Sequence, residues 1–73
     1  MKTNEVNTIE SQRIAVWKHL QVSEITPLEA LIMYGCFRLG ARIYELRKEG
    51  KKIKTEMIDI NGKRVARYSI IKN

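Results

Sequence analysis

Cysteine is almost missing from this 73-residue sequence, which contains Cys36 and no other. A single cysteine excludes an internal disulfide and any zinc site built from several cysteines, and it fits a reducing cytosol. No apolar run approaches the roughly 20 residues that a membrane-spanning helix needs. Residues 1–5 are polar, with no apolar segment behind a basic start, so we expect no secretory signal. The sequence therefore predicts a cytoplasmic protein with no membrane partner.

Catalytic motifs are missing as well. The chain has no Ser-His-Asp set, no glycine-rich phosphate loop and no paired carboxylate motif. His19 is the only histidine and has no constellation of metal-binding residues near it in sequence, so we expect no metal site. A single domain of this size buries only about 60% of its unfolded surface, which leaves little room for a deep catalytic cavity. We expect no enzymatic activity and no cofactor.

Positive charge is concentrated in one half of the chain. Residues 1–35 hold three basic and four acidic side chains, a balance of −1, whereas residues 36–73 hold eleven basic and four acidic ones, a balance of +7. A small domain with such a basic half attracts polyanions, namely nucleic acid or an anionic membrane surface.

A first helix is predicted from about residue 8 to residues 20–22. Asn7 followed by Glu10 has the form of a capping box, which places the helix start near Thr8. Residues 1–7 carry no periodicity and are expected to form a loose tail before a domain of residues 8–73. The residues that share the apolar face of this helix are Ile9, Val16, Trp17 and Leu20.

A second, short helix is predicted over residues 27–34. Thr26 stands at the cap, proline follows at the first helical position, and Glu29 stands where it can reach back to the cap. Gly35 can adopt the left-handed conformation that ends a helix. The residues expected to face inward are Leu28, Leu31 and Ile32.

A third helix is predicted over about residues 36–49, directly after the glycine turn. Leu39, Ile43 and Leu46 form a narrow apolar stripe that is expected to face the core. Two helices joined by a tight turn make a helix-turn-helix unit. The polar side of the third helix carries Arg38, Ala41, Tyr44, Glu45 and Lys48, with Arg42 on the flank.

A hairpin is predicted over residues 53–70, because Asn61-Gly62 suits a two-residue turn in which both residues have positive φ. Centred there, the register pairs Glu56 with Arg67 and Asp59 with Arg64, so opposite charges face each other. One face, expected to cover the helices, collects Ile53, Met57, Ala66, Tyr68 and Ile70, and the other carries a small Ile58/Val65 pair. The side chains expected to be largely buried are Val16, Trp17, Leu39, Ile43, Leu46 and Tyr68.

The segments ITPLEALIMYGCFRLGARIYELRKEG (residues 25–50) and GKRVARY (residues 62–68) resemble the small winged helix-turn-helix domains common in bacteriophages and prophages. The resemblance covers roughly residues 9–71. It implies an α+β fold of three helices followed by a two-stranded β-hairpin wing. It also implies a double-stranded DNA partner and a part in transcriptional regulation inside a bacterial host cell.

The candidate DNA contacts lie on the third helix, the wing and one helix start. Arg38 and Arg42 are candidates for reading guanine, with Ala41, Tyr44, Glu45 and Lys48 beside them in the major groove. The alternative is that these arginines belong to a solvated helix face with Arg42/Glu45 and Glu45/Lys48 ion pairs, and the DNA contact is favoured because the helix follows a helix-turn-helix turn. The candidates for phosphate contacts are Thr26 at the second helix start, Lys51 after the third helix, and Lys63 and Arg64 at the wing tip.

A competing hypothesis is a protein-binding module that inhibits or recruits a host or phage protein through Ile58/Val65, Phe37 and Tyr44. One continuous positive face formed by Arg38, Arg42, Lys63 and Arg64 would favour DNA, and acidic residues interrupting it would favour a protein partner. Because one small domain reads few base pairs, a homodimer or tandem binding is expected on DNA.

Overall fold

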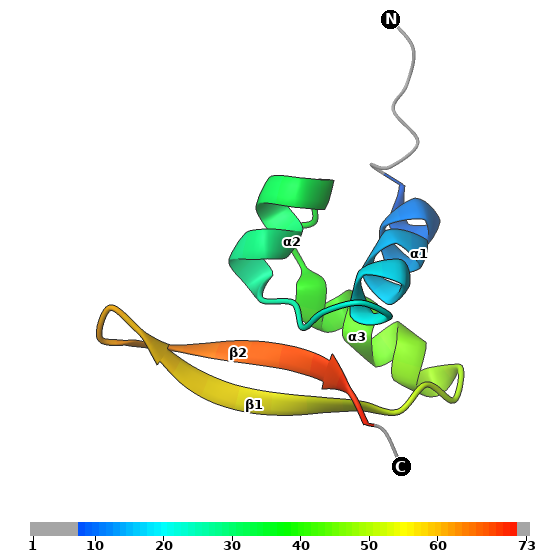
Figure 1. Ribbon diagram of the computed structural model, residues 1–73. Coiled ribbons are helices and arrows are strands. Elements are labelled where there is room, and N and C mark those ends of the chain that lie inside the picture. Colours follow the sequence, from blue (N-terminus) through cyan, green and yellow to red (C-terminus); the bar gives the residue numbers. More distant parts are fainter. Residues whose placement is uncertain (1–7, 72–73) are drawn as a thin grey trace, which may run out of the picture.

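The computed structural model describes residues 8–71, which form three helices followed by a two-stranded antiparallel sheet (Figure 1). This order confirms the predicted α+β architecture of three helices and a hairpin. Residues 1–7, the expected tail, lie outside the described residues. The elements are α1 (Ile9–Leu20), α2 (Pro27–Tyr34), α3 (Leu39–Lys48), β1 (Ile53–Ile60) and β2 (Lys63–Ile70).

Thr8 caps α1, because its Oγ1 accepts a hydrogen bond of 3.0 Å from the backbone N–H of Ser11. The predicted cap, Asn7, lies outside the described residues, so α1 begins one residue later than that pairing implied. Val16 and Leu20 are buried as predicted. Ile9, predicted on the same apolar face, is 57% exposed, since the buried residues of α1 come from its later turns.

The predicted ends of α2 are confirmed. The Thr26 hydroxyl accepts from the backbone N–H of Glu29 at 3.3 Å, and the Glu29 carboxylate accepts from the backbone N–H of Thr26 at 3.0 Å. This reciprocal pair satisfies two donors that the first turn of a helix leaves free. Gly35 closes the helix at φ 65°, a left-handed conformation that favours glycine.

The predicted inward face of α2 is wrong. Leu28 is 62% exposed, Leu31 37% and Ile32 72%, whereas Ala30 is fully buried. Nearly every side chain of this helix is apolar, so the hydrophobic pattern has no direction that would select one face. The small Ala30 side chain is the one that packs against the core, and the larger apolar side chains are left outside.

The helix-turn-helix turn is longer than predicted, because α3 begins at Leu39 and not near residue 36. Cys36 lies in this turn and is 1% exposed, so it is part of the core. Leu39, Ile43 and Leu46 are buried as predicted. The N-cap residue of α3, Arg38, makes no side-chain capping bond.

The hairpin has the predicted register at every pair from Ile53–Ile70 to Ile60–Lys63. Asn61 (φ 53°) and Gly62 (φ 80°) both have the positive φ that the turn requires. Ile25 forms an isolated β-bridge to the hairpin, since its backbone N–H and C=O each pair with Tyr68, at 3.0 and 2.9 Å. The wing extends past the helices (Figure 1), so Met57 is 49% exposed and does not cover them as predicted.

The core draws on all parts of this fold. Of the six side chains expected to be largely buried, Val16, Leu39, Ile43 and Leu46 are buried, whereas Trp17 and Tyr68 are half-buried and pack against the core from outside. Within residues 8–71, the nine buried hydrophobic residues are Val16, Leu20, Ile25, Ala30, Cys36, Leu39, Ile43, Leu46 and Ile53.

Replacing Asn61-Gly62 with Ala-Ala is expected to weaken the hairpin, because alanine disfavours the positive φ that both positions adopt. The helical core should be less affected, since the turn lies at the far end of the wing. Cross-strand contacts in NMR spectra measure the effect. A double variant that keeps its Ile58–Val65 contact at wild-type strength would contradict the assigned turn.

Candidate nucleic-acid interface

The outer side of α3 is a polar and aromatic stripe. Ala41, Tyr44 and Lys48 lie at i, i+3 and i+7, on the side of the helix opposite its buried residues. Tyr44 is 62% exposed, and the Lys48 Nζ lies 5.6 Å from the centroid of its ring. Phe37 precedes this stripe and is 84% exposed. Three of the predicted contact residues therefore share one accessible face.

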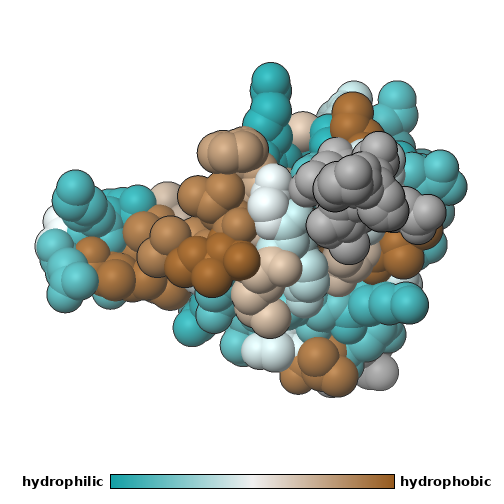
Figure 2. Space-filling view, turned by 90° about the horizontal axis from the view of Figure 1, so that it is seen from above, coloured by the Kyte–Doolittle hydropathy of each residue, from teal (hydrophilic) through white to brown (hydrophobic). Residues whose placement is uncertain are grey.

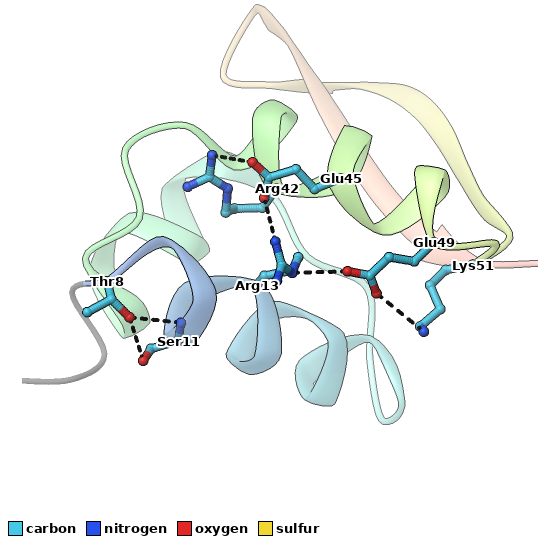
Figure 3. Close-up of polar contacts among 7 residues, drawn as sticks. All are labelled: Thr8, Ser11, Arg13, Arg42, Glu45, Glu49 and Lys51. Atoms are coloured by element: carbon cyan, nitrogen blue, oxygen red, sulfur yellow. Dashed lines mark hydrogen bonds and ion pairs between the residues drawn. The ribbon is translucent and has the colours of Figure 1, made fainter.

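Arg42 and Glu45 do not belong to that stripe. Arg42 is 7% exposed, and its Nη2 lies 2.9 Å from the Glu45 carboxylate, which also pairs with Arg13 of α1 at 3.5 Å (Figure 3). The expected exposure of Arg42 on the polar flank is wrong, because its side chain lies on the α1 side of α3, where the two helices pack. This pair joins the helices.

The same ion-pair network engages Lys51. Arg13 pairs with Glu49 at 3.2 Å, and Glu49 pairs with Lys51 at 3.6 Å (Figure 3). The Lys51 Nζ also lies 5.2 Å from the centroid of the Trp17 ring. Lys51 therefore connects the end of α3 to α1, and its charge is partly compensated within the chain.

The N-termini of α2 and α3 differ in how the backbone N–H groups of the first turn are capped. At α2, Thr26 and Glu29 satisfy each other, so the threonine hydroxyl is already engaged. At α3, no side chain caps the first turn, and the exposed Arg38 adds a cation there. A helix start with free N–H groups attracts anions, and the adjacent guanidinium strengthens that attraction.

Arg47 has a structural role that the sequence did not predict. Its Nε and Nη2 donate to the carbonyl of Ile53 at 3.0 and 2.7 Å, and Nη2 also donates to the Thr55 hydroxyl at 2.9 Å. The guanidinium thereby ties the last turn of α3 to the first residues of β1. The sequence pattern gives no sign of a bond to a backbone carbonyl six residues away.

The two cations of the wing tip lie on opposite faces of the hairpin. Arg64 lies on the same face as Asp59, its cross-strand partner, at 3.7 Å with both side chains exposed, so this ion pair stabilises little. Lys63 lies on the other face, toward α2. With Arg42 buried, the four cations Arg38, Arg42, Lys63 and Arg64 do not form one continuous positive face, so the arrangement expected to favour DNA over a protein partner is not met by these four residues.

Several cations stay available to a polyanion. Within residues 8–71, no carboxylate lies at ion-pair distance from the exposed Arg38 and Lys48 of the helix-turn-helix unit, from Lys52 just before β1, or from Lys54 and Lys63 of the hairpin. Both ends of α3 and the wing therefore carry accessible positive charge, and α1 adds the exposed Lys18.

Glu56 and Arg67 form the best-defined ion pair of the wing. Arg67 Nη2 donates to the Glu56 carboxylate at 2.9 Å, and this hydrogen bond and the guanidinium charge hold the pKa of Glu56 below its usual value. Because the pKa of Glu56 is lower in the folded state, the ion pair stabilises the hairpin at pH values above the ordinary glutamate pKa. This stabilisation is lost as the pH falls through the lowered pKa of Glu56.

We expect an NMR titration to show that the midpoint for the Glu56 carboxyl rises in Arg67→Met, because the guanidinium that lowers its pKa is gone. Equal midpoints in both proteins would contradict the pairing.

Neither a membrane span nor a metal cluster is found over residues 8–71. No helix there is long and apolar enough to cross a bilayer. The same part of the chain holds no group of three or more histidine, cysteine, aspartate or glutamate side chains arranged to hold a metal ion.

Comparison with protein families matches residues 11–73 to the winged helix-turn-helix domain family. The chain belongs to that family. In this winged helix-turn-helix domain, α2 and α3 are the helix-turn-helix unit and the β1–β2 hairpin is the wing. Membership suggests DNA binding, and such domains are typically non-enzymatic. No curated protein and no solved structure matched the chain.

Proposed function

We propose that this winged helix-turn-helix domain binds double-stranded DNA with α3 in the major groove and the hairpin as a wing beside it. The observation that carries the proposal is the outer stripe of α3, Ala41, Tyr44 and Lys48, which follows the helix-turn-helix turn and contains no carboxylate. A helix in this position is the element that enters the major groove in helix-turn-helix proteins.

Each side chain of the interface has a proposed role that follows from its chemistry. Ala41 and Tyr44 contact base edges, for example the methyl group of thymine. Lys48 and Arg38 contact the phosphates on either side, Arg38 together with the uncapped start of α3. Lys51 and Arg64 are proposed as weaker, sequence-independent phosphate contacts, whereas Lys63 lies on the face of the wing toward α2 and is not assigned this role. We assign Arg42, Glu45 and Thr26 structural roles, because each is already bonded within the chain.

We further propose that the protein acts as a phage or prophage transcriptional regulator in the cytoplasm of a bacterial host. A single α3 reads few base pairs, so two domains on neighbouring half-sites are needed for useful specificity. The alternative, a module that inhibits or recruits a host or phage protein, draws on the apolar residues exposed on α2 and the wing.

Lys48→Ala tests the proposal, with Lys18→Ala as the matched control because Lys18 is an exposed cation on α1. If Lys48 contacts a phosphate, its loss should weaken binding to every duplex and lower the slope of log affinity against log salt by about one. Fluorescence anisotropy with a labelled duplex at several salt concentrations measures both quantities. Equal effects of the two substitutions would contradict the assigned face.

A further inference from the structure

An apolar groove runs between α2 and the wing. It has a volume of about 620 Å³, and its floor is formed by Leu28 and Ile32 of α2 and by Ile58, Ile60 and Val65 of the wing. Seen from above, the apolar side chains of α2 and the adjoining wing gather in one patch (Figure 2). The outer stripe of α3 does not contribute to this groove.

The helical half of this groove has the pattern of a buried surface. Leu28 and Ile32 lie at i and i+4, one turn apart on the same side of α2, so both apolar side chains face the groove. Nothing within residues 8–71 covers Leu28 and Ile32, which are 62% and 72% exposed. A contiguous apolar patch rimmed by polar side chains marks an interaction site.

The charges along the rim favour one kind of occupant. Glu24 and Glu29 lie along the α2 side of the groove, and Lys63 and Arg67 lie along the wing side. The two signs balance here, although the chain as a whole carries +6. Two copies of a chain with this net positive charge repel each other. At the rim of the groove the acidic and basic side chains balance, so this repulsion is weakest there.

We propose that a second copy of this chain covers the groove, so that α2 of each protomer packs against α2 and the wing of its partner about a two-fold axis. A two-fold interface uses the same patch on both protomers, so a patch with one acidic and one basic side is complementary to itself. The acidic side of one copy then meets the basic side of the other, while Leu28 and Ile32 of both copies are buried. This proposal rests on the proposed DNA-binding function, because the dimer would supply the second domain that binding to two half-sites needs. The dimer itself forms without DNA.

Ile32→Glu tests the interface, because it places a charge at the centre of the groove on a side chain exposed enough to leave the fold intact. Ile14→Glu on α1 is the matched control, since Ile14 is 49% exposed and lies outside the groove. Analytical ultracentrifugation of the full chain without DNA should show wild type and Ile14→Glu at about twice the 8.5 kDa of one chain. Ile32→Glu should dissociate with a dissociation constant at least tenfold higher. Wild type that stays monomeric, or two variants that behave alike, would overturn the proposal.

Charge reversal tests the two-fold arrangement itself. Glu24→Lys alone and Lys63→Glu alone each place like charges across the interface and should weaken the dimer severalfold. A mixture of the two variants forms heterodimers in which both contacts again join opposite charges, so the mixture should recover wild-type association. A mixture no tighter than either variant would overturn the arrangement. Dimers that form but do not bind a DNA duplex would contradict the DNA-binding proposal and leave this one standing.

Discussion

Replacing Leu46 with alanine is expected to lower the free energy of unfolding by about 2–5 kcal/mol. Leu46 is 2% exposed in the centre of the core, so its loss removes buried apolar area and leaves a cavity that its neighbours fill only in part. In a domain of this size each kcal/mol moves the melting temperature by about 4–8 °C. Thermal unfolding followed by circular dichroism should therefore show a drop of roughly ten degrees or more.

Leu28→Ala is the matched control for that measurement. It makes the same chemical change on a helix, but Leu28 is 62% exposed in a single chain. At concentrations where the protein is monomeric, its effect should stay within about 0.5 kcal/mol, as for most surface substitutions. Equal losses from the two substitutions would show that the core has been assigned to the wrong side chains.

Glu45→Ala is expected to lower the free energy of unfolding by about 1–3 kcal/mol, because it leaves the Arg42 guanidinium buried without its carboxylate partner. The Arg42 side chain is 9% exposed, whereas that of Glu45 is 30% exposed, so the penalty comes mainly from the arginine. Arg42→Met/Glu45→Ala should then be less destabilised than Glu45→Ala alone, since the double variant buries no unpaired charge. Chemical denaturation of both variants measures the difference.

The same pair separates a structural role from a DNA contact. Arg42→Met should leave discrimination between duplex sequences unchanged, because the side chain points toward α1 and not toward the outer stripe of α3. A flattened sequence preference in Arg42→Met, without loss of stability, would show that Arg42 reads bases after all.

Features set by neighbours in sequence could be predicted from the sequence. The capping box of Thr26 and Glu29 and the Asn61-Gly62 turn depend on a few adjacent residues, and both are present as expected. The strand register follows from the turn, so every cross-strand pair was predicted correctly. In each case the local chemistry leaves one favourable geometry.

Features set by tertiary packing could not be predicted in the same way. In α2 apolar residues lie on all sides of the helix, so the sequence does not show which of them is buried. Ala30 is buried because the other core elements pack closely against its side of the helix. The i, i+3 spacing of Arg42 and Glu45 predicts an ordinary surface ion pair. Only the packing of α1 against α3 buries the arginine. The Arg47 bond to Ile53 and the β-bridge between Ile25 and Tyr68 involve backbone groups, which carry no sequence signal.

The central proposal is that the outer stripe of α3 is the surface that meets DNA. Titrating the isotope-labelled protein with a short duplex and recording backbone amide shifts by NMR tests it most directly. We expect the largest changes at Arg38, Ala41, Tyr44 and Lys48, with smaller ones along the wing and almost none at Leu28 of α2. Changes confined to α2 and the groove beside it, with the amides of α3 unmoved, would contradict the proposal.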